Sequence, residues 1–404
     1  MTAEPSRVTL RRSLSLPWLV FYGVGVTVGA GIFALIGEIV ALAGDHAPLS
    51  FMIAGLIAVF TGLSFAALSS VYPHAAGEAI YVKEGLGQMA GRLVGLGLVA
   101  AAITSSAVIS LAFAGYLAAV IDAPEMPSVV IVLLVLAVIA WLGVKISVGF
   151  AALITILEVG TLIVIIAAGL PHTAAEGALS NLAAWPASET LWMATLSGAF
   201  LAFFAFIGFE NIVNLAEETH SPETAIPKAV ILTLIVTVAI YLLVAIVAVT
   251  FPDRAALSLS KAPLAVLFER TSDFSGAPIA AIASIAMVNG ILVQIIMASR
   301  VLYGMANAGM LPQMLARLDS KRQTPVLAIV LVVTAVLAFT LFVPFLELAA
   351  LTSLVILMVF TAVNLSLFLI GSRAAAAPRL RRWRWWGAMG TLMSAGLIVA
   401  ELIG

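Results

Sequence analysis

Long apolar runs, separated by short breaks rich in glycine, proline and charged residues, fill most of the chain. Eleven of these runs have the length of about 20 mostly apolar residues that a membrane helix needs. Because the runs are continuous and do not alternate at every second residue, they predict helices and argue against a membrane β-barrel. The expected spans are 15–43, 49–71, 92–121, 128–144, 147–170, 190–216, 228–250, 277–305, 324–344, 346–371 and 385–402.

The basic residues fall almost entirely on alternate breaks. With a cytoplasmic N-terminus over residues 1–14, 16 of the 19 Lys and Arg residues are cytoplasmic, and only Arg254, Lys261 and Arg270 lie outside. The positive-inside rule favours this orientation, and eleven spans then place the C-terminus outside the cytoplasm. We expect a multi-pass protein of the inner or plasma membrane, with the segment 381–386 (RRWRWW) as an interfacial anchor before the last span.

The composition supports this interpretation and excludes other classes. Hydrophobic residues make up 63% of the 404 residues and charged residues only 10%, whereas a soluble domain carries about 25% charged residues. The apolar excess must therefore face lipid, which excludes soluble, fibrous and disordered proteins. The absence of cysteine excludes a disulfide scaffold, a thiolate metal site and a cysteine nucleophile.

The first and sixth spans differ from ordinary lipid-facing helices. The first contains a glycine-rich core at 28–33 (VGAGIF), and the sixth contains a glycine next to a carboxylate at 206–210 (FIGFE). Each opens one five-helix half of the chain. Interrupted helices at matching positions of two halves indicate a transporter site, although glycines also serve ordinary helix packing.

Two interrupted helices can bind both charged ends of one small molecule. A half-helix that begins near Gly31 would present free N–H groups and a positive dipole end, which suit a carboxylate. A half-helix that ends near Ile207 would present free carbonyl groups, which suit an ammonium group. Together the two ends are complementary to an α-amino acid.

Five motifs occur in order along the chain and on the expected sides of the membrane: 29–33 (GAGIF), 72–81 (YPHAAGEAIY), 206–210 (FIGFE), 216–228 (AEETHSPETAIPK) and 298–312 (ASRVLYGMANAGMLP). In this combination the chain resembles the amino acid–polyamine–organocation superfamily of transporters. The resemblance covers most of the chain.

The resemblance implies an all-α, LeuT-like fold of two inverted five-helix repeats with broken helices one and six and alternating access. The repeats would cover 15–170 and 190–371, and one extra helix would cover 385–402, whereas relatives usually have twelve helices. The substrate carboxylate would meet the backbone of the first break and the amino group the carbonyls of the second, which assigns to the binding site Thr27, Gly29, Ala30, Gly31, Phe204, Ala205 and Ile207.

Three carboxylates, Glu38, Glu158 and Glu210, fall within predicted spans, where a charge costs about 2.5–3.5 kcal/mol on insertion scales. We interpret Glu210 as a gating or coupling group, with a tie to the unwound backbone as the alternative. Glu158 stands in a neighbourhood where several proton-coupled relatives carry a lysine, so it is our candidate proton carrier or cation ligand. A structural pairing with Asn289 or Gln294 is the alternative for Glu158, and Glu38 is interpreted as structural.

The surroundings of the predicted site limit its substrate. No basic residue lies deep in a span, which argues against acidic amino acids, and the small residues Ala30 and Ala205 favour neutral, fairly small or apolar ones. Cationic substrates are an alternative through Glu210. Polar residues that could line the pathway, each with interhelical hydrogen bonding as its alternative role, are Thr104, Ser105, Ser106, Asn289 and Gln294.

Three rival classes lack the residues or motifs that they would need in this sequence. An intramembrane enzyme would need catalytic or metal-binding residues within the spans, but the four histidines fall in loops or at helix edges, and paired aspartates do not occur. A channel would need a filter-like segment, and ATP-driven transport a Gly-Lys-Ser/Thr motif; the sequence contains neither.

We therefore expect a secondary transporter and not an enzyme. Its expected partners are an amino acid, protons and the lipid bilayer, with proton-coupled symport as the mechanism and exchange or sodium-coupled symport as alternatives. No cofactor, metal ion or nucleic acid is expected, and the sequence leaves the oligomeric state open.

Overall fold

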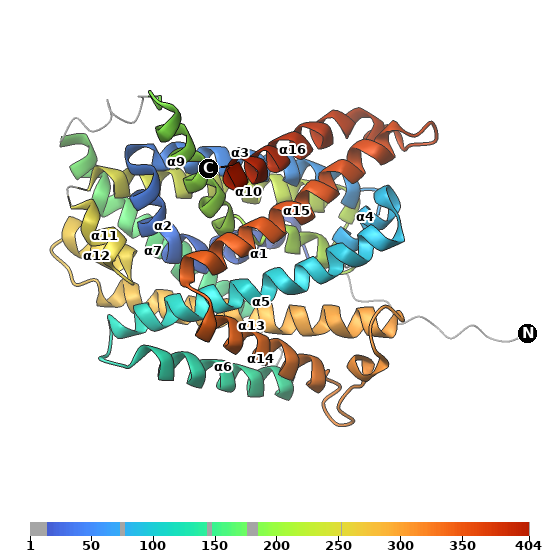
Figure 1. Cartoon of the computed structure of the whole chain (residues 1–404), viewed down its shortest axis with the longest axis horizontal. Coiled ribbons are helices and arrows are strands. Elements are labelled where there is room, and N and C mark those ends of the chain that lie inside the picture. Colours follow the sequence, from blue (N-terminus) through green and yellow to red (C-terminus); the bar gives the residue numbers. More distant parts are fainter. Residues whose placement is uncertain (1–13, 73–76, 144–147, 176–184, 252, 404) are drawn as a thin grey trace, which may run out of the picture.

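The computed structural model describes residues 14–72, 77–143, 148–175, 185–251 and 253–403 (Figure 1). Within these ranges the chain is helical, and its one extended pairing is an isolated parallel bridge between Leu14 and Thr219. The expected cytoplasmic segment 1–14, except for Leu14, lies outside the described residues. So do Lys145 and residues 73–76 of the second motif.

The described helices follow the apolar runs of the sequence. Three of them are short 3₁₀ segments, η1 (Gly44–His46), η2 (Phe209–Glu218) and η3 (Gln313–Ala316). The α-helices are α1 (Leu16–Thr27), α2 (Ala30–Ala43), α3 (Ala47–Ser69), α4 (Gly77–Leu86), α5 (Gln88–Ala118), α6 (Glu125–Leu142), α7 (Val148–Ala175), α9 (Glu189–Ala205), α10 (Pro222–Thr250), α11 (Arg254–Leu259), α12 (Pro263–Thr271), α13 (Ala277–Asn307), α14 (Val326–Phe342), α15 (Phe345–Ser372) and α16 (Pro378–Ile403).

Nine helical stretches in the described part of the chain are long and apolar enough to cross a membrane. One of them, Ala30–Ser69, joins the second part of the expected span 15–43 to the expected span 49–71. The chain turns between α2 and α3 at Gly44, which adopts a φ of +54°. Two shorter apolar helices, α1 and α14, add to these stretches. The all-helical membrane fold is confirmed, and the number of eleven spans stays a prediction.

The two expected interruptions are present. The first apolar run divides into α1 and α2, and the sixth divides into α9 and η2. Other bounds differ from the expected ones: α16 begins at Pro378, so the segment 381–386 lies inside the helix and not before it. Two connections that we expected as loops, at 73–91 and 251–276, contain the helices α4, α11 and α12.

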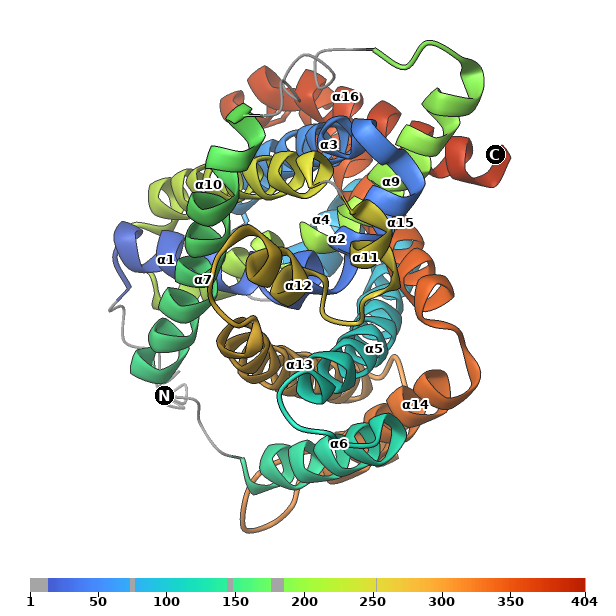
Figure 2. The same cartoon turned by 90° about the vertical axis from the view of Figure 1, so that its left-hand side faces the viewer.

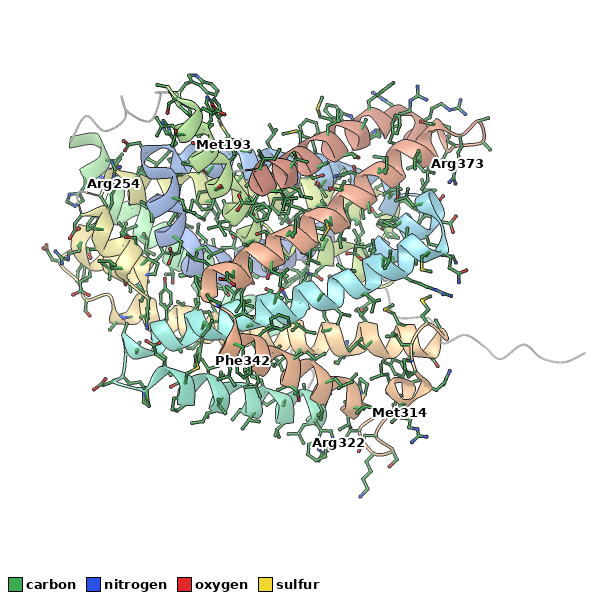
Figure 3. All side chains as sticks on the ribbon, in the orientation of Figure 1. Met193, Arg254, Met314, Arg322, Phe342 and Arg373 are labelled. Atoms are coloured by element: carbon green, nitrogen blue, oxygen red, sulfur yellow. The ribbon has the colours of Figure 1, made fainter. Side chains whose placement is uncertain are left out.

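The two ends of the molecule differ in their charged residues. In Figure 3, Arg373 lies toward one end of the long axis and Arg254 toward the other, as the alternating breaks of the sequence predict. Figure 2 looks onto the Arg254 end and shows α11 and α12 over the middle of the molecule, where both contact α2. This end is therefore covered by short helices.

A buried aromatic cluster fixes the segment that follows the second interruption. Phe65 of α3 makes edge contacts with Tyr81 of α4, Phe209 of η2 and Phe360 of α15, at ring centroid distances of 6.1, 5.8 and 5.5 Å. All four side chains are buried. The cluster holds η2 and α4 together against α3 and α15, because edge-to-face aromatic contacts add to the burial of large apolar surfaces.

Candidate functional site

The first helix break lies between α1 and α2. α1 ends at Thr27, and the N–H of Val28 still donates to the carbonyl of Val24 (2.7 Å). The chain then turns at Gly29, which has no side chain to cap the first turn of α2. The first N–H groups of α2 therefore form a positive dipole end of the kind that binds anions.

The second break lies between α9 and η2. α9 ends at Ala205, and the N–H of Ile207 donates to the carbonyl of Phe204 (3.2 Å). The turn ends at Gly208, whose φ of +133° lies in the region that favours glycine. A Cβ atom there would also stand only 2.7 Å from the carbonyl oxygen of Val26. The second break thus packs directly against the last turn of α1.

One tyrosine joins the two breaks. The hydroxyl of Tyr241, on α10, lies 2.7 Å from the carbonyl oxygen of Thr27 and 2.9 Å from that of Ala205. Because a hydroxyl has one proton to donate, the two carbonyls share it. Tyr241 is fully buried, and its ring contacts Phe206 edge-on. The hydroxyl of Tyr241 therefore links the C-terminal ends of α1 and α9.

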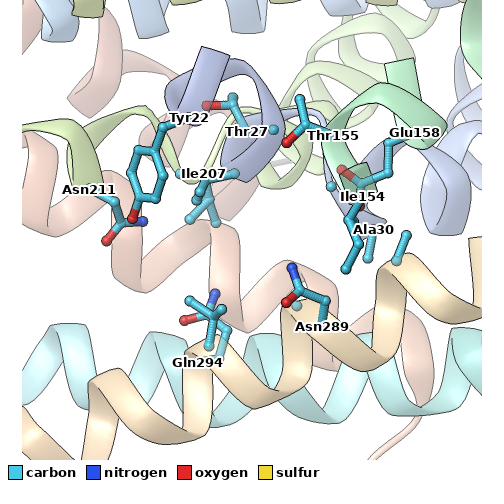
Figure 4. Close-up of a pocket in the computed structure, with 18 of the residues that line it drawn as sticks. Tyr22, Thr27, Ala30, Ile154, Thr155, Glu158, Ile207, Asn211, Asn289 and Gln294 are labelled. Carbon is cyan, nitrogen blue, oxygen red and sulfur yellow. The ribbon is translucent and has the colours of Figure 1, made fainter. Parts of the chain in front are cut away.

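A cavity of about 310 Å³ lies against both breaks (Figure 4). Its volume falls in the lower part of the range of about 300–1,000 Å³ that is typical of small-molecule sites. Residues of α1, α2, α5, α7, α9, η2 and α13, together with the turn after α9, line it, and most of the lining is apolar. The site therefore has the size and polarity of a pocket for a small organic molecule.

The structure brings the predicted binding residues together. All of them line this one cavity: Thr27, Gly29, Ala30, Gly31, Phe204, Ala205 and Ile207.

At Gly31 the backbones of α2 and α9 approach one another closely. A Cβ atom at this position would stand 2.6 Å from the Cα atom of Ala205. The absence of a side chain at Gly31 therefore permits α2 and α9 to pack backbone against backbone. This role is separate from any contact with a ligand.

Glu158 lies in the wall that α7 contributes to the cavity and is 3% exposed. The side-chain amides of Asn289 and Gln294, which we considered as its structural partners, make other contacts or none. Gln294 donates to the hydroxyl of Ser105 at 3.5 Å, and Asn289 has a buried Oδ1 atom without a partner in the described part of the chain. Neither amide forms a hydrogen bond with Glu158 among the described residues.

The other two carboxylates do not line the cavity. Glu210 is buried in η2, and its Oε2 atom accepts the N–H of Gly208 at 2.8 Å. This contact is the backbone tie that we set against a gating role. Glu38 is half-buried on α2, and Figure 4 shows Glu158, but not Glu38, beside the cavity.

The two ends of the cavity differ. At the end covered by α11 and α12, the hydroxyl of Tyr116 donates to the carbonyl of Phe33 (2.8 Å) and accepts from the N–H of Leu264 (3.3 Å). An ion pair between Arg254 and Asp45 ties α11 to η1. The contacts of Tyr116 link α5, α2 and α12 at this end of the cavity.

Toward the opposite end, the cavity continues along α1 and η2. Its lining there includes Trp18 and Tyr22 of α1, Leu215 and Glu218 of η2, and Leu14 before α1. Backbone hydrogen bonds from Leu14 to Glu218 and from His220 to Leu14 hold these two segments together. The cavity therefore reaches toward the end that we expect to be cytoplasmic.

Sequence reasoning missed several residues of the site. Tyr22, Thr155 and Asn211 line the cavity, and Tyr241 joins the breaks, but none of them belongs to a motif that we used. One signal was available for Tyr241: a tyrosine in the middle of an apolar run needs a partner for its hydroxyl.

The chain is similar to known transport proteins over its whole described length. A family model described as "Amino acid permease" matches residues 14–403. An uncharacterised transporter of Mycobacterium tuberculosis is 32% identical over 332 residues, which cover 81% of this chain and 73% of that protein. The branched-chain amino acid permease BcaP of Bacillus subtilis is 25% identical over 403 residues, which cover 94% of this chain and 85% of BcaP.

A solved structure has the same arrangement of helices. The crystal structure of MhsT in complex with L-phenylalanine matches with a TM-score of 0.64 and covers 97% of this chain and 98% of MhsT. At 16% sequence identity the likeness shows the fold alone. The LeuT-like fold with two interrupted helices is thereby confirmed.

Proposed function

The chain belongs to the amino acid permease family, and from this premise we propose that it is a secondary active transporter that carries neutral amino acids by alternating access, coupled to protons. Its relatives are named as transporters and permeases, which are not enzymes. The observation that carries the proposal is one cavity bounded by two opposite helix ends, the N-terminus of α2 and the C-terminal end of α9.

The two helix ends suit the two charged groups that all α-amino acids share. The carboxylate binds the N–H groups at Gly29, Ala30 and Gly31, where the dipole end is positive and no side chain competes. The ammonium group binds carbonyl oxygens at the end of α9. A carbonyl oxygen has two lone pairs, so the carbonyl of Ala205 can accept from the ligand as well as from Tyr241.

The charges of the cavity favour a neutral side chain on the substrate. The described lining contains the carboxylates of Glu158 and Glu218 and no Lys, Arg or His. An acidic side chain would therefore meet carboxylates and no cation, which costs free energy in a site of low dielectric constant.

Glu158 is the group that we assign to proton coupling. It is an almost fully buried carboxylate in a membrane helix, and it lies in the wall of the substrate cavity. A carboxylate in such a place is expensive to keep charged and is a functional candidate by default. In this mechanism Glu158 takes a proton on the outer side and releases it on the inner side together with the substrate.

The opening of the cavity supports an inward-facing state of the transport cycle. Contacts of Tyr116 link α5, α2 and α12 at one end of the cavity, and the cavity extends between Trp18 and Glu218 at the other. We infer that the second end is cytoplasmic and that the repeats 15–170 and 190–371 move against one another during transport. The C-terminus after α16 would then lie outside the cytoplasm.

The test is uptake of labelled amino acids into proteoliposomes under an inward proton gradient, an inward sodium gradient and no gradient. We expect accumulation of neutral amino acids with the proton gradient alone. Glu158→Gln should lower this accumulation by about tenfold or more, with substrate affinity changed by less than about threefold, because the variant removes the titratable group and keeps its size.

Glu38→Gln is the matched control, since Glu38 also lies in a membrane helix but away from the cavity, and it should accumulate substrate like the wild type. Accumulation with sodium alone, or exchange without any gradient, would replace proton symport by one of those mechanisms. Unchanged accumulation in Glu158→Gln would remove Glu158 from the coupling mechanism. The absence of any amino acid uptake or binding would overturn the proposed function itself.

A further inference from the structure

The wall of the cavity that α13 contributes is a single stripe of that helix. The residues that face the cavity recur at positions i, i+3, i+4, i+7, i+8 and i+11, which lie on one face of an α-helix: Ala286, Asn289, Gly290, Val293, Gln294 and Met297. Two of these six side chains are carboxamides. A wall that served only to pack an apolar substrate would not need them.

These amides have unused hydrogen-bonding capacity. The Oδ1 atom of Asn289 is buried and has no partner among the described residues. Within the described part of the chain, the side chain of Gln294 makes one hydrogen bond, to the hydroxyl of Ser105 on α5, at the long distance of 3.5 Å. Buried polar groups in proteins are almost always paired, so a stripe with spare donors and acceptors on a cavity wall indicates a ligand that pairs with them.

The position of the amides matches the side chain of a bound amino acid. Figure 4 shows Asn289 projecting from α13 toward Ala30, which belongs to the first break, and Gln294 further along the cavity, on the side of Ile207 and Tyr22. An amino acid whose backbone groups occupy the two breaks therefore directs a short side chain toward Asn289. A longer side chain reaches toward Gln294.

The chemistry of this wall selects among neutral side chains. Asn289, Gln294 and Ser105 are uncharged and can both donate and accept, while Ile109 and Val293 beside them are apolar. Resting on the proposed function, we propose that Asn289 and Gln294, with Ser105, form a side-chain subsite that selects amino acids with a hydroxyl or carboxamide group over apolar amino acids of the same shape. Threonine, asparagine and glutamine are the substrates of this class.

The inference is tested with pairs of amino acids that differ in polarity but hardly in shape. In wild-type proteoliposomes, threonine is compared with valine, asparagine with leucine and glutamine with methionine, each as an unlabelled competitor of labelled threonine uptake. We expect the polar member of each pair to compete at an about tenfold lower concentration, because a site that hydrogen-bonds its ligand rejects the analogue that lacks the group.

Asn289→Leu should reduce the threonine-to-valine ratio to within about threefold of unity while labelled valine is still taken up, since only the polar partner is lost. Gln294→Met should act mainly on the glutamine-to-methionine ratio. Ser284→Ala is the matched control: Ser284 also lies in α13, donates only to the carbonyl of Ala280 and does not line the cavity, so both ratios should stay as in the wild type.

The outcomes separate this inference from the proposed function. Equal or better competition by valine and leucine in the wild type would overturn the polar subsite and leave amino acid transport standing. A wild-type-like ratio in Asn289→Leu, with folding verified by thermal denaturation, would overturn the role of Asn289. Failure of every amino acid to bind or to be taken up would overturn the proposed function and the subsite with it.

Discussion

The two helix breaks of the site are built in opposite ways. At the first break, the position of a Cβ on Gly29 has only two backbone oxygens within 4 Å, the nearer at 3.5 Å. At the second, Gly208 is packed against the backbone of Val26, and its N–H is taken by the carboxylate of Glu210. The first break therefore presents the N–H groups at the start of α2 to a ligand, whereas the N–H of Gly208 at the second break helps to hold the turn.

The difference separates two reasons for a glycine in a membrane helix. Gly29 leaves space beside a free helix end, whereas Gly31 and Gly208 permit backbones to touch. A bulky substitution at Gly31 would thus disturb the packing of α2 against α9 as well as the approach of a carboxylate. The two effects can be separated by small substitutions at different glycines of the same break.

The largest effect is expected from Gly31→Ala. Its methyl group would stand 2.6 Å from the Cα atom of Ala205, and backbone cannot move aside as a flexible side chain can. Overpacking of this kind costs about 1–3 kcal/mol or more, so we expect a lower melting temperature in detergent and loss of uptake. Gly160→Ala is the control, because a Cβ at Gly160 has no neighbour within 4 Å. Wild-type stability and uptake in Gly31→Ala would contradict the close contact of α2 with α9.

A smaller and more selective effect is expected from Gly29→Ala. The added methyl group has space, so the melting temperature should stay close to that of the wild type. It would stand beside the free N–H groups of α2 and hinder the carboxylate, and we expect the apparent affinity for the substrate to fall by about tenfold. Competition assays in proteoliposomes measure this change. Unchanged affinity would mean that the carboxylate binds elsewhere in the cavity.

The positions of both breaks could be predicted from the sequence, because local composition determines them. A glycine-rich core such as 28–33 is a poor helix former in a run that otherwise spans a membrane. The structure divides the first run after Thr27 and the sixth after Ala205, within a few residues of the expected positions. The family motifs then placed both breaks at one site, which periodicity alone does not do.

The contacts that distinguish the two breaks could not be predicted in this way. Tyr241 joins them from more than 200 residues after Thr27, and its apolar run gives no indication of which carbonyl its hydroxyl meets. The choice between gating and a backbone tie for Glu210 depends on the backbone angles of Gly208. Both contacts arise from tertiary packing, which the pattern of a single segment does not contain.

A moderate effect on both breaks is expected from Tyr241→Phe. The variant removes the one hydroxyl that contacts the carbonyls of Thr27 and Ala205 and keeps the ring contact with Phe206. A lost buried hydrogen bond costs about 1–3 kcal/mol, so we expect a lower melting temperature and a transport rate reduced by several-fold. Kinetics that resolve KM from kcat test this, with Tyr303→Phe near the C-terminal end of α13 as the control. If only stability changes, Tyr241 positions the helices without affecting transport.

The smallest effect is expected from the replacement of Glu78, a second acidic residue near the second break, and it concerns the pH dependence of stability. Glu78 is buried in α4, a helix in the connection between the second and third spans, and burial raises the pKa of its carboxyl to about 8, with the carboxylate of Glu210 contributing. Glu210 of η2 and Tyr81 of α4 are the titratable groups that interact with it.

The sign of the pH dependence follows from proton binding. The folded protein keeps the proton of Glu78 up to about pH 8, whereas the unfolded chain releases it near the ordinary glutamate pKa of 4.5. Between these values the folded state binds more protons, so its stability falls as pH rises. Glu78→Gln has no proton to lose, and its melting temperature should fall less from about pH 5 to about pH 8 than that of the wild type. Glu84→Gln, an exposed carboxylate of the same helix, should follow the wild type. Equal slopes for the wild type and Glu78→Gln would show that folding does not raise the pKa of Glu78 and that this carboxylate is charged in the folded protein.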